Sequence, residues 1–224
     1  PSLAIGAVIA GICIVGVFFG VGGLSESSEP LIEKQLLEEN TVPTQVTFDT
    51  FFENGSPILG NPNAPITLIE FGDYQCHFCN VYYHNTEHEI FEKYVMTGKV
   101  NVIFKDYTII GPDSVVAAHA AHCAGEQGKF WEFHDKLFTT QTALDVESLK
   151  LYADELGIEI DAFSTCLEES RHEQTVTEEM AAGRSYGATS TPTLFINGGP
   201  VFGAMPLDTF DEIIQEELAI VARQ

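Results

Sequence analysis

The sequence predicts an α/β fold in which one domain is interrupted by an inserted helical subdomain. Three observations predict it: a strand–helix–strand pattern over 66–104, several helical patterns over about 113–187, and a strand–turn–strand–helix pattern from 193 onward. The first and third segments supply the two halves of a sheet, and the middle segment shows no convincing strand. A chain of 224 residues is long enough for one such domain.

The first half of the sheet is predicted from two short apolar runs, Ile66–Phe71 and Val100–Phe104. Between them, Val81–Met96 has the pattern of a helix that ends at Thr97-Gly98. Two strands joined by one helix are typical of a parallel pair with a right-handed crossover.

The insertion is predicted to be helical because large apolar residues recur at helical spacing between Phe130 and Phe138. Asp145 and Asp161 are predicted to be the N-caps of two later helices, since aspartate favours that position.

The second half of the sheet begins with the predicted strand Thr193–Ile196. Asn197-Gly198-Gly199 is predicted to be a turn, and Val201-Phe202 the hairpin partner of the strand. A final helix is expected, because apolar residues from Phe210 to Val221 fall on one helical face.

The N-terminal segment contains an uninterrupted apolar run, Leu3–Leu24. About 20 such residues span a bilayer, so residues 1–24 are predicted to be a transmembrane signal anchor. Cleavage near Gly23 is the alternative. The flank that follows has no Lys or Arg before Lys34, and positive charge usually marks the cytoplasmic side. We therefore expect a stalk over 25–43 and an extracytoplasmic domain over 44–224.

Acidic residues outnumber basic ones in this chain. It has 33 Asp and Glu against 10 Lys and Arg, a formal net charge of −23. Such a charge argues against nucleic acid, and against an anionic membrane surface, as the main partner.

Cys76-His77-Phe78-Cys79 lies where a predicted strand runs into a predicted helix. Two cysteines at this spacing can close a small disulfide, and a helix N-terminus stabilises the thiolate of the first. The same spacing also occurs in zinc sites, but the strand and the helix around it favour redox chemistry. Cys76 is predicted to be the attacking thiol and Cys79 the resolving one. His77 is either a stabiliser of the Cys76 thiolate or an exposed residue without a large effect.

The soluble part contains four cysteines, the pair above together with Cys123 and Cys166. An even number in an exported domain suggests two disulfides, for which three pairings are possible. A Cys76–Cys79 pair would leave Cys123 with Cys166, and two separate buried thiols are the alternative.

Glu70 is a carboxylate in an otherwise apolar strand. If it is buried, its pKa rises and it becomes a candidate proton relay to Cys79; strand alternation could equally point it to solvent. Thr191-Pro192 precedes another strand, a position that tolerates proline. The sequence alone favours a trans bond there.

A metal site is an alternative interpretation of His84 and His88, which are four residues apart on one predicted helix. Helical histidine pairs without a third ligand are usually solvated, so no metal site is predicted. No organic cofactor is expected either, because the cysteine pair is itself a redox group.

Three segments resemble the DsbA-like branch of the thioredoxin superfamily: Glu70–Cys79 its active-site segment, Gly125–His134 a helical-insert segment, and Tyr186–Gly198 its cis-proline segment. The resemblance covers roughly Thr44 to the C-terminus and implies a thioredoxin-like fold with the helical subdomain inserted. It implies that Thr191-Pro192 is cis and lies beside the disulfide, where its backbone pairs with substrate. It also implies a buried acid six residues before the first cysteine, the position of Glu70. Some relatives carry a second, structural disulfide in the helical insert, where Cys123 and Cys166 fall.

The residues between the cysteines depart from the usual pattern of this branch. DsbA-type oxidases often carry Pro-His there, with the histidine next to the second cysteine, whereas this chain has His77-Phe78. Thr191 before the proline is found in disulfide isomerases and reductases as well as in oxidases. The direction of electron flow therefore stays open.

The predicted function is a membrane-anchored, extracytoplasmic thiol–disulfide oxidoreductase that introduces disulfides into exported proteins. Its expected partners are reduced or misoxidised exported proteins and, as the resemblance implies, a quinone-linked membrane protein that reoxidises it. One alternative is a reductase or isomerase on the same scaffold. The other is a protein that handles copper or zinc through Cys76, Cys79 and a histidine.

Overall fold

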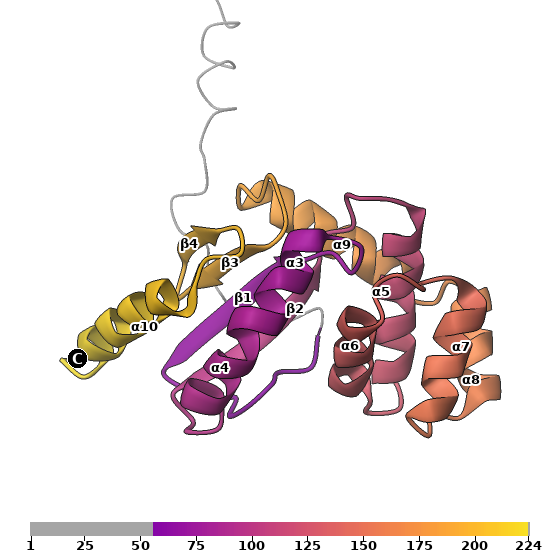
Figure 1. Cartoon of the computed structure of the whole chain (residues 1–224), viewed down its shortest axis with the longest axis horizontal. Helices are drawn as coiled ribbons and strands as arrows, with labels where there is room; N and C mark the ends of the chain where they lie inside the picture. The colour runs from indigo at the N-terminus through magenta and orange to yellow at the C-terminus, as the bar shows by residue number, and fades with distance from the viewer. Residues whose placement is uncertain (1–55, 224) are drawn as a thin grey trace, which may run out of the picture. The chain divides into compact units, whose positions relative to one another are not determined.

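The computed structural model describes residues 56–223, which build a four-stranded sheet and the helices around it (Figure 1). The strands are β1 (Ile66–Gly72), β2 (Val100–Asp106), β3 (Thr193–Ile196) and β4 (Gly199–Phe202), in the order β2-β1-β3-β4. β1 and β2 are parallel, while β3 is antiparallel to both β1 and β4. The predicted parallel pair and hairpin are confirmed, although β4 begins at Gly199 and shortens the predicted turn to two residues.

β1 is the strand that leads into the cysteine pair, and all seven of its residues are buried. It lies between β2 and β3, so that Glu70 pairs with Phe104 on one side and with Leu194 on the other. Side chains along a strand alternate between the two faces of the sheet. Because both faces are covered at β1, side chains on either face are buried. The alternative in which Glu70 points to solvent is therefore wrong.

The helix after β1 begins at His77, four residues earlier than predicted, and continues to Val95. It consists of α3 (His77–Tyr82), the π-helical turn η1 (Tyr83–Glu87), α4 (His88–Ile90) and a second π-helical turn η2 (Phe91–Val95). Together with α10 (Leu207–Val221) it covers one face of the sheet (Figure 1). The core of this layer includes Tyr82, Ile90 and Tyr94 from the first helix, Leu68 and Leu194 from the strands, and Phe210 and Ile214 from α10.

The insertion consists of five helices: α5 (Pro112–Gly125), α6 (Phe130–Thr139), α7 (Val146–Glu155), α8 (Ile160–Glu168) and α9 (Glu173–Ser185). α9 contacts β2 and brings Met180 and Tyr186 against the face of the sheet that carries Ile69 and Phe71. The other four helices, at the right of Figure 1, pack around a second apolar core, which also includes Phe104 of β2 and Cys79 of α3.

The two predicted N-caps in the insertion have different outcomes. Asp145 caps α7, because its side chain accepts a hydrogen bond from the backbone N–H of Ser148. Asp161 as a cap is wrong: α8 is capped by Glu159, whose carboxylate accepts from the N–H groups of Asp161 and Ala162. The glutamate side chain reaches those donors from two and three residues earlier, so Asp161 lies inside the first turn.

The predicted transmembrane anchor over 1–24 and the stalk over 25–43 lie outside the described residues. Between residues 56 and 223, no helix combines the length and the apolar character needed to cross a bilayer.

Candidate active site

The cysteine pair lies at the end of β1, where the chain turns into α3. The backbone N–H of Cys76 donates to the carbonyl of Asp73 at 2.9 Å, which closes the turn between the strand and the helix. Cys76 is the N-cap residue of α3, and Cys79 lies within its first turn. Both are free thiols in this structure, and both are buried.

The pKa of Cys76 is lowered from 9.0 to about 5. The largest cause is a hydrogen bond from the side chain of Cys79, and the backbone N–H groups of Cys79 and Phe78 at the start of the helix add to it. Burial acts in the opposite direction but is outweighed. Cys76 is therefore a thiolate at neutral pH, as a helix N-terminus favours.

Cys79 has the opposite character. Burial is the largest cause that raises its pKa well above 9.0, followed by its hydrogen bond to Cys76 and by the negative charge of Glu70. One thiol of the pair thus carries the nucleophilic charge and the other holds its proton. This asymmetry is what an attacking and a resolving thiol require.

Glu70, near enough to interact electrostatically with both cysteines, has only 2% of its surface exposed. Burial raises its pKa well above 4.5, and the charges of Glu87 and Cys76 raise it further. Among the described residues, its Oε1 atom has no hydrogen-bond partner. A carboxyl group in this state can hold a proton at neutral pH and exchange it with a neighbouring thiol.

The Thr191–Pro192 peptide bond is cis, and it lies beside the attacking cysteine. The Cys76 sulfur lies 3.3 Å from the carbonyl oxygen of Thr191, a residue 115 positions away in the sequence, and the protonated thiol can donate to it. The backbone before Pro192 is therefore next to the reacting sulfur.

His77 and Phe78, the two residues between the cysteines, are both exposed. Their rings contact each other with centroids 5.5 Å apart, and 60% of Phe78 is accessible.

Sequence reasoning missed two residues that hold the active-site turn. Asp73 accepts hydrogen bonds from four groups around the turn. Gln141, in the loop after α6, donates through Nε2 to the carbonyl of Cys76 at 2.8 Å. An acid three residues before Cys76 is a visible signal, whereas nothing in the sequence points to a glutamine 65 residues away.

The other two described cysteines form a disulfide. Cys123 of α5 and Cys166 of α8 are joined with an S–S distance of 2.00 Å, the pairing that the resemblance implies. Both are buried in the core of the helical insertion.

Two clusters within residues 56–223 bring metal-binding side chains together, and neither contains Cys76 or Cys79. One consists of Cys123, Cys166 and His172, but its sulfurs are bonded to each other. The other consists of Asp106, His122 and Glu179, and Lys105 pairs with Glu179 at 3.0 Å. Because a lysine ammonium already balances this second cluster, it offers a cation little net negative charge.

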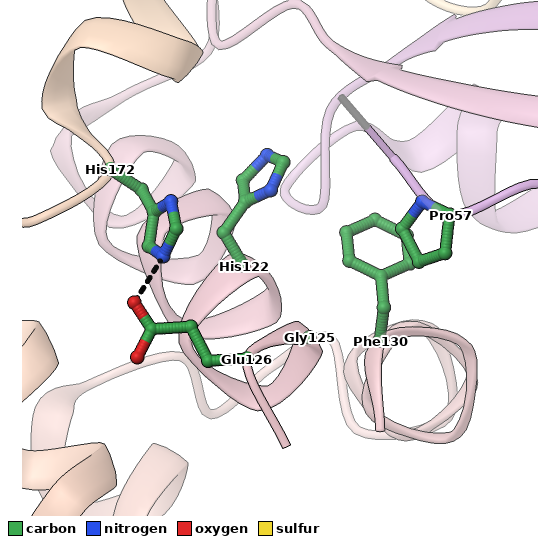
Figure 2. Close-up of a pocket in the computed structure, with 6 residues that line it drawn as sticks. All are labelled: Pro57, His122, Gly125, Glu126, Phe130 and His172. Atoms are coloured by element: carbon green, nitrogen blue, oxygen red, sulfur yellow. Dashed lines mark hydrogen bonds and ion pairs between the residues drawn. The ribbon is translucent and has the colours of Figure 1, made fainter. Parts of the chain in front are cut away.

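A pocket of about 320 Å³ opens beside these clusters (Figure 2). His122 and His172 lie side by side at its wall, and His172 is hydrogen-bonded to Glu126 at 3.0 Å. The remaining lining residues are Pro57, Gly125 and Phe130. The pocket is therefore separate from the cysteine pair.

Comparison with known proteins agrees with this geometry. A family model described as thioredoxin matches residues 53–216. Disulfide bond formation protein D from Bacillus subtilis is 27% identical over 172 residues, which cover 73% of this chain and 78% of that protein. The crystal structure of oxidised BdbD from the same organism superposes with a TM-score of 0.68 at 26% identity, covering 74% of this chain and 97% of that one.

Longer proteins also contain a similar segment. The Na⁺/H⁺ antiporter NhaA 1 from Salinispora arenicola is 29% identical over 164 residues, covering 72% of this chain. The chain spans only 24% of the length of that antiporter.

The matched family model covers more than half of the chain. The chain therefore belongs to the thioredoxin family, as a DsbA-like thiol–disulfide oxidoreductase.

Proposed function

We propose that this protein is a membrane-anchored, extracytoplasmic oxidase that introduces disulfides into exported proteins. The observation that carries the direction is the low pKa of Cys76, about 5. A thiolate stabilised in the reduced protein makes the disulfide form a stronger oxidant.

The size of this effect follows from the pKa. At pH 7, two pH units above the pKa of about 5, ionisation stabilises the reduced pair by about 2.7 kcal/mol. For a two-electron couple this corresponds to about 60 mV. The contribution is large enough to move the pair away from a reducing potential such as the roughly −270 mV of thioredoxin, toward the roughly −120 mV of DsbA.

The proposed reaction has two exchange steps. A substrate thiolate attacks the Cys76 sulfur of the oxidised pair, the Cys76–Cys79 bond breaks, and Cys79 leaves and takes up a proton. A second substrate thiolate then attacks the substrate sulfur of the mixed disulfide and expels Cys76 as a stable thiolate. Two electrons pass to the pair, and the substrate leaves with a disulfide.

Glu70 is proposed to supply the proton that Cys79 takes up. Burial raises the pKa of Glu70 and so favours the protonated form, which can give its proton to Cys79. The backbone of Thr191 and Pro192 is proposed to pair with the substrate segment that carries the reacting cysteine. The role of His77 in stabilising the Cys76 thiolate stays a prediction.

Location and partners belong to the same proposal. The apolar run Leu3–Leu24 and its uncharged-to-acidic flank support an anchored domain outside the cytoplasm. Similarity to a protein named for disulfide bond formation supports exported proteins as substrates. The proposed reoxidising partner is a quinone-linked membrane protein.

The decisive experiment is the reduction potential of the Cys76–Cys79 pair, measured on the full chain in detergent by equilibration with glutathione buffers between pH 4 and 8. We expect a value at pH 7 closer to about −120 mV than to about −270 mV. The potential should change by about 30 mV per pH unit above the Cys76 pKa and by about 60 mV below it, because reduction then takes up a second proton. A value near that of thioredoxin would instead indicate a reductase or isomerase.

A further inference from the structure

Asp73 lies in the turn between β1 and the cysteine pair, and only 1% of its surface is exposed. Its Oδ1 atom accepts hydrogen bonds from the backbone N–H of Gln75 at 2.8 Å and from the hydroxyl of Ser114 at 2.7 Å. Its Oδ2 atom accepts from the N–H groups of Ile109 and Ile110 at 2.8 and 3.0 Å. Four donors therefore satisfy this buried carboxylate, two on each oxygen.

The backbone of Asp73 contacts both cysteines. Its carbonyl accepts the N–H of Cys76 at 2.9 Å. Burial is the main influence on the Cys79 thiol and raises its pKa, but a backbone hydrogen bond from Asp73 acts on the same thiol and lowers it. The backbone of Asp73 therefore contacts both cysteines, while its side chain is fixed by four hydrogen bonds.

Three of the four donors come from a second segment, residues 107–114, which runs from the end of β2 into the first turn of α5. Gln75 strengthens this connection, because its Oε1 atom accepts from the backbone N–H of Ser114 at 2.9 Å. The packing is close at Gly111, where a Cβ atom would lie 2.9 Å from the same Oε1 atom. The active-site turn and the start of the insertion are therefore held together at several points, and Asp73 is at their centre.

We propose that Asp73 is a positioning residue for thiol–disulfide exchange, whose side chain holds the active-site turn so that Cys76 and Cys79 keep their relative placement. This inference rests on the proposed chemistry of the pair, although it does not depend on the direction of electron flow. If the turn relaxes, the N–H groups at the start of α3 no longer point at the Cys76 sulfur, and the thiolate loses stabilisation.

The test is the variant Asp73→Asn, which keeps the size of the side chain but replaces one acceptor oxygen with an amide that cannot accept a hydrogen bond. We expect the midpoint pH of Cys76 alkylation to rise by about one unit. We also expect exchange with a dithiol substrate to slow by about tenfold.

Glu179→Gln is the matched control. Glu179 is also buried, with 2% exposed, and it also accepts from a backbone N–H, that of Asp106 at 2.7 Å. It is on α9, and its hydrogen bonds reach Lys105 and Asp106 of β2 rather than the active-site turn. This variant should lose stability and keep the alkylation midpoint of the wild type.

Three results would overturn the proposal. One is an unchanged midpoint in Asp73→Asn, and another is an equal rise in both variants. The third is a lower midpoint, which would show that Asp73 acts through its negative charge. If Asp73→Asn does not fold, Ser114→Ala removes one of the four donors and must show a smaller rise in the midpoint. Since each result is a comparison with the wild type, it is independent of the wild-type potential that tests the proposed function.

Discussion

The two thiols of the active site differ in ionisation because they occupy different positions on the same helix. Cys76 lies before the first turn, where backbone N–H groups converge, whereas Cys79 lies inside the helix above a buried acid. We predict that the alkylation rate of Cys76 by iodoacetamide is half-maximal near pH 5, since only the thiolate reacts. Mass spectrometry of the labelled peptide measures it. The remaining labelling in Cys76→Ser should have a far higher midpoint, and a wild-type midpoint near 8.5 would contradict the assignment.

The buried carboxyl group of Glu70 destabilises the folded protein, and its proposed role in proton transfer to Cys79 accounts for this. Its pKa is raised in the folded protein, so the folded state keeps a proton that the unfolded state releases above about pH 4.5. The free energy of unfolding therefore falls as pH rises through this window. We predict that Glu70→Gln is more stable than the wild type at pH 8, because the variant has no buried carboxyl group to hold protonated or to ionise.

Urea unfolding of both reduced proteins at pH 5 and pH 8 measures this difference, which should be smaller at pH 5. The same variant should form the mixed disulfide with substrate more slowly, because Glu70 is proposed to supply the proton that Cys79 takes up in that step. A variant that is less stable at pH 8 would show that the carboxylate is stabilised by a contact other than those described.

At the scale of elements, a buried group of charges joins β2 to α5 and α9. His122 of α5 lies 2.8 Å from Asp106 of β2, and Lys105 of β2 pairs with Glu179 of α9 at 3.0 Å. Burial lowers the pKa of His122, but hydrogen bonds to Asp106 and Glu179 outweigh it and raise the pKa to about 10. The histidine is therefore charged in the folded protein at neutral pH.

This arrangement predicts a loss of stability at alkaline pH. Because the folded pKa of His122 exceeds the unfolded value of 6.5, its contribution is fully present below pH 6.5 and is lost as pH rises through about 10. Between these limits the wild type should lose about 1.4 kcal/mol per pH unit relative to His122→Gln. Urea unfolding at pH 6, 8 and 9.5 measures the slope. Parallel curves for the two proteins would mean that His122 is neutral in the fold.

The disulfide joins α5 to α8, helices that share the core of the insertion. It closes a loop with a sequence separation of 43, for which chain entropy predicts a stabilisation of about 4 kcal/mol. We expect the double variant Cys123→Ala and Cys166→Ala to lose about this free energy of unfolding in urea. The alkylation midpoint of Cys76 should stay unchanged. A shifted midpoint would show that the bond also shapes the active site.

Strands and turns could be predicted from the sequence where the residue pattern within a short segment determines them. The apolar runs of β1 and β2 and the Asn197-Gly198 turn have signals within a few residues, and the structure contains all three. The burial of Glu70 was undecided, because alternation assumes one solvated face and β1 has none. Gln141 and the His122 cluster could not be predicted, since their contacts join distant parts of the chain. Asp161 was mistaken for a cap because aspartate and a nearby glutamate compete for the same donors.

At the scale of the whole molecule, the active site lies where the sheet meets the helical insertion. Cys76 and Cys79 are part of the same apolar core as Phe133, Leu137 and Phe163 of the insertion. The insertion also donates the Gln141 hydrogen bond to the carbonyl of Cys76. The helical insertion therefore contributes residues to the active site in addition to packing against the sheet.

The net charge of −23 acts on the whole molecule through self-repulsion. Charges of one sign repel over about 30 Å at 0.01 M salt but over only about 10 Å at 0.1 M. Compaction brings them together, so low salt destabilises the folded state relative to the expanded one. We predict that the melting temperature of the full chain in detergent rises between about 0.01 M and 0.5 M NaCl, with most of the rise below about 0.1 M.

Sodium sulfate matched in ionic strength separates screening from salt effects on apolar burial. Screening predicts equal rises in the two salts at low concentration, whereas sulfate adds further stabilisation at high concentration. A melting temperature that falls with NaCl would mean that ion pairs such as Lys136–Glu155 and Arg171–Glu126 stabilise the fold more than the excess acidic charge destabilises it. These pairs are partly exposed, and exposed pairs contribute only about 0–1 kcal/mol each, so the balance should favour repulsion.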